Sequence, residues 1–188
     1  MKIHNAINEG SQFLKKKNIK SFLIDSEILM SKVIQKERKY IILNSNENLN
    51  EKSLDLFKKM INLRSLGKPI AYIIGQKDFW KSKFKITEDV LIPRPDTELL
   101  VEEVLKLTKH KSNLSILEIG VGSGCVLLSI LKEKKSFYGT GIDISKKCLE
   151  LSKINSFELG LNNRTKFFKS DIDNFNYGKY DLIISNPP

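Results

Sequence analysis

Residues 115–124 read SILEIGVGSG, and this stretch decides the fold of the second half of the chain. The segment 115–119 is a short apolar run of the kind that forms a buried strand. The three glycines that follow, Gly120, Gly122 and Gly124, have the spacing GxGxG at a predicted turn from strand to helix. Because glycine has no Cβ, backbone N–H groups there can come close to a ligand at the N-terminus of the next helix. A tight turn also uses glycine, but three in such a short stretch favour a ligand-binding loop.

Predicted strands and helices alternate outward from this loop. Helices are expected after Ser123 and over 146–159, and strands over 115–119, 137–143, 164–170 and 180–185. Strands that alternate with helices in this order form a parallel, doubly wound sheet. The sequence therefore predicts an α/β, Rossmann-like fold for this part of the chain.

The first part of the chain has a different pattern. Residues 1–75 read as four short amphipathic helices with brief loops, which predicts a small all-α bundle. One helix is expected over 26–34, with Asp25 as its N-cap. The segment KDFWKSKFKI then alternates apolar residues with lysine, which is the period of a hairpin or an extended linker. We expect a bundle at 1–75, a hairpin linker at 76–90 and the N-terminal half of an α/β domain at 91–188.

Composition and charge limit the possible classes of protein. The net charge is +10, from 32 basic and 22 acidic residues, and residues 1–75 carry most of the excess. This excess could indicate a surface that binds nucleic acid or a ribonucleoprotein. However, arginine, which can donate two hydrogen bonds to one phosphate, is scarce. The sequence therefore favours the interpretation that the lysines lie on solvated helix faces. No apolar run of about 18 residues could span a membrane, and the N-terminus lacks a signal peptide. The two cysteines, Cys125 and Cys148, lack metal-site spacing, so we expect a cytoplasmic protein without a metal site.

The glycine spacing also indicates the ligand. A dinucleotide-binding fingerprint would place its third glycine where this chain has Cys125. The pattern GxGxG, with an acidic residue at the end of the next strand, instead resembles the S-adenosylmethionine site of class I methyltransferases. Asp143 in GTGID fills the acidic position, where a carboxylate can accept bonds from both ribose hydroxyls. The alternative is that Asp143 only precedes the start of a helix.

The same resemblance implies further contacts with the cofactor. Glu118, two residues before the loop, would fix the loop or reach the methionine amino group. Asp171 would contact adenine with Ile172 lining the ring, although a carboxylate that caps a turn explains Asp171 nearly as well. The implied cofactor site comprises Glu118, Gly120, Val121, Gly122, Ser123, Gly124, Asp143, Asp171, Ile172 and Asn186.

The last predicted strand leads into Asn186, Pro187 and Pro188. Ligands in open α/β sheets bind at the carboxyl edge of the strands, where this segment would lie. A planar nitrogen is a poor nucleophile because its lone pair is delocalised. The side-chain oxygen of Asn186 and a neighbouring main-chain carbonyl could accept both of its N–H bonds and hold it in line with a methyl donor. Proline offers no competing N–H. Asn-Pro also forms ordinary turns, but the segment follows a GxGxG loop and a matching acid, so we predict that Asn186 and Pro187 are catalytic.

Residues 91–98, LIPRPDTE, narrow the resemblance. Together with LEIGVGSG, GIDIS and ISNPP, they resemble the protein N5-glutamine methyltransferases that modify peptide-chain release factors. The resemblance implies methyl transfer from S-adenosylmethionine to the glutamine of the Gly-Gly-Gln loop. The bundle would dock the release factor, with neither nucleic acid nor a membrane required. The residues that would contact the substrate are Arg94, Asn186, Pro187 and Pro188. The alternative for Arg94 is a salt bridge to a nearby acid. Asp96 or Thr97 would cap a helix.

Three other interpretations remain open from the sequence. A nucleic-acid adenine-N6 methyltransferase shares the Asn-Pro-Pro motif, and a non-catalytic module could bind a release factor or the ribosome. A dinucleotide-dependent oxidoreductase fits less well because of the glycine spacing. Members of the resembled family continue beyond this point, so we expect strand 180–185 to lie at an unpaired edge. The chain alone is expected to have little or no transferase activity.

Overall fold

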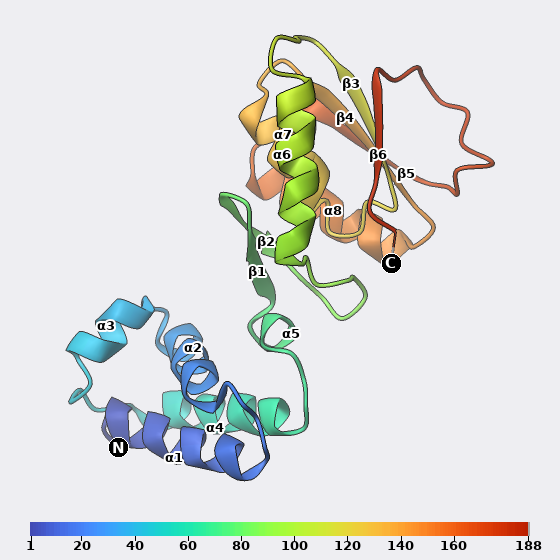
Figure 1. Ribbon diagram of the computed structural model, residues 1–188. Helices are drawn as coiled ribbons and strands as arrows, with labels where there is room; N and C mark the ends of the chain where they lie inside the picture. The colour runs from blue at the N-terminus through green and yellow to red at the C-terminus, as the bar shows by residue number, and fades with distance from the viewer. Residues whose placement is uncertain (188) are drawn as a thin grey trace. The chain divides into compact units, whose positions relative to one another are not determined.

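The computed structural model describes residues 1–187, and the chain divides into two compact units, Met1–Ile74 and the part from Gly75 onward (Figure 1). Across the described residues, the helices are all too short or too polar to span a membrane. Groups of three or more acidic, histidine or cysteine side chains that could hold a metal ion are likewise absent from residues 1–187.

The first unit is a helical bundle. Its helices are α1 (Ile3–Lys16), α2 (Phe22–Ile34), α3 (Arg38–Leu43), α4 (Glu51–Ser65) and α5 (Ile70–Ile74). The four predicted helices are confirmed, and Asn50 caps α4 by accepting a bond from the amide of Ser53. Helix α5 was not predicted from the sequence. The carbonyl of Pro69 accepts the first helical bonds of α5, from the amides of Tyr72 and Ile73. A proline, which lacks an N–H, is well suited to the start of a helix.

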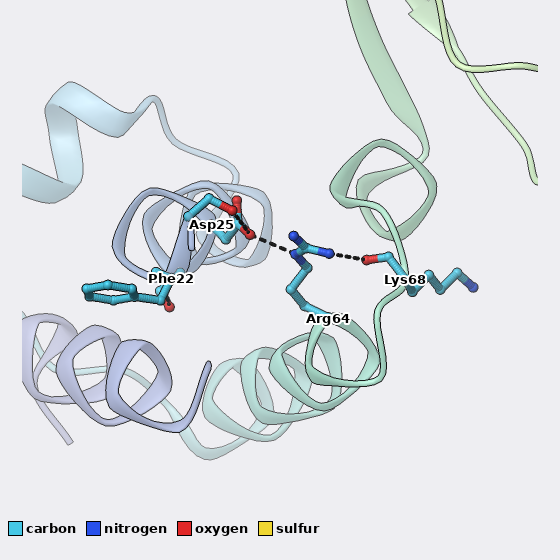
Figure 2. Close-up of polar contacts among 6 residues, drawn as sticks. Phe22, Asp25, Arg64 and Lys68 are labelled. Carbon is cyan, nitrogen blue, oxygen red and sulfur yellow. Dashed lines mark hydrogen bonds and ion pairs between the residues drawn. The ribbon is translucent and has the colours of Figure 1, made fainter. Parts of the chain in front are cut away.

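Asp25 is not the N-cap of α2, so that prediction was wrong. The helix begins at Phe22, and Asp25 is a buried residue within it. Its Oδ2 accepts a bond of 2.7 Å from Nε of Arg64 on α4 and another of 2.7 Å from Oγ of Ser21. Figure 2 shows the guanidinium of Arg64 between Asp25 and the carbonyl of Lys68. This ion pair ties α2 to α4 inside the bundle.

The second unit begins with an antiparallel hairpin of β1 (Gln76–Phe79) and β2 (Ser82–Lys85). The hairpin is confirmed, but it is a folded part of this unit and not a linker, because Phe79 and Phe84 are buried and meet edge to face at 6.2 Å. Its turn places Trp80 at φ +53°, which is rare for a bulky residue. The amide of Trp80 donates to Oε1 of Glu98 at 2.7 Å, and its indole N–H donates to Oε1 of Glu133 at 2.9 Å.

A parallel sheet forms the centre of this unit. Its strands β3 (Ser115–Ile119), β4 (Tyr138–Asp143), β5 (Thr165–Lys169) and β6 (Leu182–Ser185) have the order β5-β4-β3-β6. The other elements are η1 (Pro95–Thr97), α6 (Glu98–Leu107), α7 (Cys125–Glu133), α8 (Lys146–Glu158) and η2 (Asn162–Arg164). The predicted α/β fold with a parallel sheet is therefore confirmed, and β3 lies beside β6.

Helix α7 is fixed to the rest of the unit at both ends. The carboxyl group of Glu118 on β3 accepts a bond of 3.0 Å from the amide of Leu127 in the first turn. The guanidinium of Arg164 donates to the carbonyls of Leu131, Lys134 and Phe137 at 2.8 to 3.0 Å at the other end. Both groups satisfy backbone atoms that have no partner within the helix, and the cation suits the negative end of the helix dipole.

Helix α6 is buried over a narrow face. Val101 and Val104 are buried, whereas Leu99 and Leu107 are exposed. The run of apolar residues from 99 to 107 is too wide for the single stripe that packs against α7.

We expect Arg64→Ala to destabilise the bundle by roughly 3 kcal/mol, because it leaves the carboxylate of Asp25 buried without a cation. Arg38→Ala is the matched control, since Arg38 pairs with Glu27 but its side chain is half exposed; it should cost less than about 1 kcal/mol. Urea unfolding followed by circular dichroism measures both values. Equal losses of unfolding free energy in the two variants would show that the buried ion pair stabilises the bundle no more than the exposed one does.

Candidate active site at the carboxyl edge of the sheet

The candidate site lies where the parallel strands end. The chain runs from β3 to β4 and β5 on one side, and β6 lies on the other side of β3, so the order of the strands switches at β3. Ile119 pairs with Ile142 on β4 and with Ser185 on β6. The segments that follow these residues therefore meet at one edge, which is where open α/β sheets bind ligands.

The glycine loop follows β3. Gly120, Gly122 and Gly124 have φ values of +70°, +53° and +78°, a conformation that favours glycine. The amides of Gly120 and Val121 donate to the carbonyl of Ile142, and the amide of Gly124 donates to that of Val121. These donors are used inside the protein, and a buried carboxyl group stands at the first turn of α7. These amides are therefore unavailable to a pyrophosphate, which binds to free amides at a helix N-terminus.

One side of the loop is open. A Cβ added at Gly120 would have no described atom within 4 Å, and one added at Gly122 would meet only the carbonyl of Gly120, at 3.9 Å. The opposite side is supported by α8, where Ser152 and Asn155 donate to loop carbonyls. Neither residue was predicted from the sequence, because nothing in a helix pattern marks which buried polar residue faces a loop.

Asp143 lies at the end of β4, beside the loop. Its Oδ2 accepts a bond of 3.0 Å from the amide of Gly122, and its Oδ1 accepts one of 2.8 Å from the amide of Ser145. Ser145 is the N-cap of α8, so the interpretation of Asp143 as a residue that precedes a helix start also describes it. A carboxylate has about four lone-pair sites, so Asp143 can still accept bonds from two hydroxyl groups.

Glu118 is buried below the loop. Burial raises the pKa of its carboxyl group to about 8, although the bond from the amide of Leu127 partly offsets the effect. The group is therefore mainly neutral at pH 7 and joins β3 to the helix that follows the loop. Desolvation likewise raises the pKa of the Cys125 thiol to about 12, so its place at a helix N-terminus does not activate it.

Asp171 and Ile172 follow β5 at the same edge. The carboxylate of Asp171 accepts bonds from the backbone amide of Asn174 at 2.9 Å and from its side-chain amide at 2.8 Å. The structure therefore agrees with the interpretation that Asp171 caps a turn. The contact of Asp171 with adenine stays a prediction. The side chain of Ile172 is half exposed. The segment that follows is held by an aromatic cluster that the sequence analysis missed, in which ring centroids lie 4.9 to 6.2 Å apart: Phe168, Phe175, Tyr177 and Tyr180.

Asn186 follows β6 and meets a residue from a distant part of the chain. Its Nδ2 donates a bond of 3.2 Å to Oγ1 of Thr97 in η1. Among residues 1–187, none donates to Oδ1 of Asn186, which is exposed together with Pro187. The prediction that Asp96 or Thr97 caps α6 was wrong: neither side chain caps it, and Thr97 has a helical backbone rather than the extended one of an N-cap.

Arg94 and Pro188 complete the predicted site. Arg94 is exposed directly before η1, and its guanidinium pairs with no carboxylate in the described part of the chain, so the salt-bridge alternative is not found. Pro188, which was expected to contact the substrate, lies outside the described residues.

The strand order, the glycine loop and the carboxylate at the end of the next strand define the fold of the class I methyltransferases. The models of two protein families match the chain: the PrmC N-terminal domain at residues 5–75 and the methyltransferase small domain at residues 95–188. The chain belongs to the release factor glutamine methyltransferase family.

Several curated relatives carry that family name, among them the following three. The protein of Buchnera aphidicola subsp. Acyrthosiphon pisum is 41% identical over 165 residues, which cover 87% of this chain and 58% of the relative. The protein of Leptospira interrogans is 38% identical and covers 97% and 65%. That of Clostridium acetobutylicum is 37% identical and covers 100% and 67%. The chain thus spans about three fifths to two thirds of the length of these relatives.

We expect the stability of the second unit to fall as the pH rises from 5 to 8. The pKa of Glu118 in the folded protein, about 8, lies above its ordinary value of 4.5, so the folded state binds more protons in this range. The free energy of unfolding should fall by up to about 1.4 kcal/mol per pH unit. Glu118→Gln keeps an acceptor for the amide of Leu127 but does not titrate.

Urea unfolding of both proteins at several pH values tests this expectation. The wild type should lose stability relative to Glu118→Gln across the range and level off above pH 8. Parallel curves for the two proteins would show that Glu118 is ionised in the folded state at neutral pH.

Proposed function

We propose that the protein transfers a methyl group from S-adenosylmethionine to the N5 amide of the glutamine in the Gly-Gly-Gln loop of peptide-chain release factors, in the cytoplasm. Membership of the family supports this proposal. The observation that carries it is the orientation of the Asn186 side chain. Because Thr97 accepts the N–H of this amide, Oδ1 is left to accept a bond from a substrate at the edge of the sheet that holds the glycine loop.

The residues present fit S-adenosylmethionine. The remaining lone pairs of Asp143 would accept the two ribose hydroxyls, and the open side of the glycine loop would receive the amino-acid part of the cofactor. Ile172 offers an exposed apolar surface for adenine, with Asp171 beside it. The cofactor would supply a methyl group activated by a positively charged sulfur. Glu118 would act by fixing α7 behind the loop.

The proposed reaction requires the protein to position an amide nitrogen. This nitrogen is weakly nucleophilic because its lone pair is delocalised into the carbonyl. Oδ1 of Asn186 and the main-chain carbonyl of Pro187 would accept its two N–H bonds, which orients the nitrogen and stabilises the positive charge that develops on it. The N–CH3 bond would form as the bond from sulfur to methyl breaks, and one N–H proton would leave to the solvent that reaches Asn186 and Pro187. Arg94, which has no carboxylate partner among residues 1–187, and Pro188 would contact the rest of the glutamine loop.

The first unit would dock the release factor. Residues 1–75 carry 14 basic and 7 acidic residues, a charge that suits an acidic protein surface. This assignment rests on the charge and on the match to the PrmC N-terminal domain.

The transfer itself can be tested with the chain in excess over the acceptor, so that a single slow turnover is detected. Radioactive S-adenosylmethionine is supplied with a release factor, with the same factor carrying asparagine in place of the loop glutamine, and with adenine-containing DNA. Label on the first acceptor alone supports the proposal. Label on DNA would favour an adenine-N6 methyltransferase, and cofactor binding without label on any acceptor would favour a non-catalytic binding module.

We expect Asp143→Ala to weaken the binding of S-adenosylmethionine by at least roughly 100-fold. The variant loses two bonds to a charged acceptor, each contributing about 1.5 kcal/mol or more, and 1.4 kcal/mol is a factor of ten in affinity. Asp173→Ala removes an exposed carboxylate after β5 and is the matched control, with affinity unchanged. Calorimetric titration gives both constants. Similar affinities for wild type and Asp143→Ala would remove Asp143 from the proposed site.

A further inference from the structure

Helix α8 holds the back of the glycine loop through two buried side chains. Oγ of Ser152 donates a bond of 2.8 Å to the carbonyl of Gly122, and Nδ2 of Asn155 donates one of 2.8 Å to the carbonyl of Ser123. Ser152 and Asn155 are 0% and 1% exposed. Without these donors, two loop carbonyls would lack partners in a region that water reaches poorly, because Ser123 is itself buried.

Gly122 is consequently fixed on both sides of its α-carbon. Its amide donates to Asp143, at the end of β4, and its carbonyl accepts from Ser152 on α8. A glycine has more backbone conformations to lose than any other residue, so a loop of glycines does not hold one conformation by itself. The two bonds restrict the backbone of Gly122 to one conformation, which the glycine-rich sequence of the loop does not do by itself.

Asn155 also joins the loop to the hairpin. Its Oδ1 accepts a bond of 2.8 Å from the amide of Lys85, and its Nδ2 donates to the carbonyl of Lys85 at 3.1 Å. One side chain thus connects α8, the glycine loop and the end of β2. Movement of the hairpin would disturb the same amide group that holds Ser123.

We propose that Ser152 and Asn155 are positioning residues that hold the glycine loop in its ligand-binding conformation, and that Asn155 makes this conformation depend on the hairpin. The identity of the ligand, S-adenosylmethionine, rests on the proposed function. The holding of the loop rests on the bonds described above and can be measured without any ligand.

Helix α8 itself provides a matched pair of variants. Ser156 lies four residues after Ser152, is 1% exposed, and shares a bond of 2.7 Å with Oγ1 of Thr165 on β5, away from the loop. Ser152→Ala and Ser156→Ala each delete one buried hydroxyl from the same helix. A merely structural role would give the two variants the same properties.

Hydrogen exchange of the amides of Gly122 and Gly124, followed by NMR, reports how often the loop opens, because both amides are bonded in the closed loop. We expect Ser152→Ala to speed this exchange about tenfold and to weaken the binding of S-adenosylmethionine by a similar factor, which corresponds to the loss of one hydrogen bond. Ser156→Ala should change neither the exchange rate nor the affinity, even if its melting temperature falls as far as that of Ser152→Ala.

A second variant tests Asn155. Asn155→Asp keeps the size of the side chain and the acceptor for Lys85, but it loses both bonds that Nδ2 donates and places a carboxyl oxygen against the carbonyls of Ser123 and Lys85. Loop exchange should therefore increase more than in Ser152→Ala. Asn163→Asp makes the same chemical change at an exposed position and is the control.

The outcomes for the two proposals are separate. If the wild type does not bind S-adenosylmethionine, the proposed function fails, and hydrogen exchange still decides the role of Ser152 and Asn155. Equal loop exchange in Ser152→Ala and Ser156→Ala would overturn the inference even if the cofactor binds.

Discussion

The second unit depends on the attachment of helix α7 to the sheet. The glycine loop is the connection between β3 and α7, so its ends are fixed only if that helix is fixed. Glu118 fixes the first turn and Arg164 the last. Both side chains come from the sheet side of the fold, one from β3 and the other from the short turn before β5. Because the two attachments lie at opposite ends of the helix, neither a shift along its axis nor a tilt leaves both intact.

The site is then assembled from ends of elements that the sheet brings together. β3 contributes the loop, β4 contributes Asp143 and β6 contributes Asn186, and the parallel register brings all three to one edge. Thr97 comes from a turn outside the sheet and orients Asn186. Two stretches that lie far apart in the sequence therefore serve one group, because residues 91–98 orient the amide that residues 185–187 present.

Local patterns were sufficient to predict most of the elements and the glycine loop. The strand at 115–119 was predicted with its observed bounds, because a short apolar run before glycines is a local signal. Asp25 shows where local signals fail. An aspartate before an apolar helical run resembles an N-cap, but its partner Arg64 is 39 residues away, and the ion pair places it inside the helix. The bond between Thr97 and Asn186, which are 89 residues apart, and the bond between Lys85 and Asn155 were not predicted either, because in each case the partners are distant in the sequence. Asp171 was compatible with two interpretations because a turn-capping carboxylate and a ligand-binding one occupy the same place after a strand.

The hairpin turn has a consequence for spectroscopy. Trp80 is the single tryptophan of the chain, and its indole is bonded to Glu133, near the end of α7. Fluorescence excited at wavelengths that tyrosine does not absorb therefore comes from this turn alone. Such emission follows the attachment of the hairpin to α7 and does not report on the helical bundle, so the second unit can be observed by itself within the intact molecule.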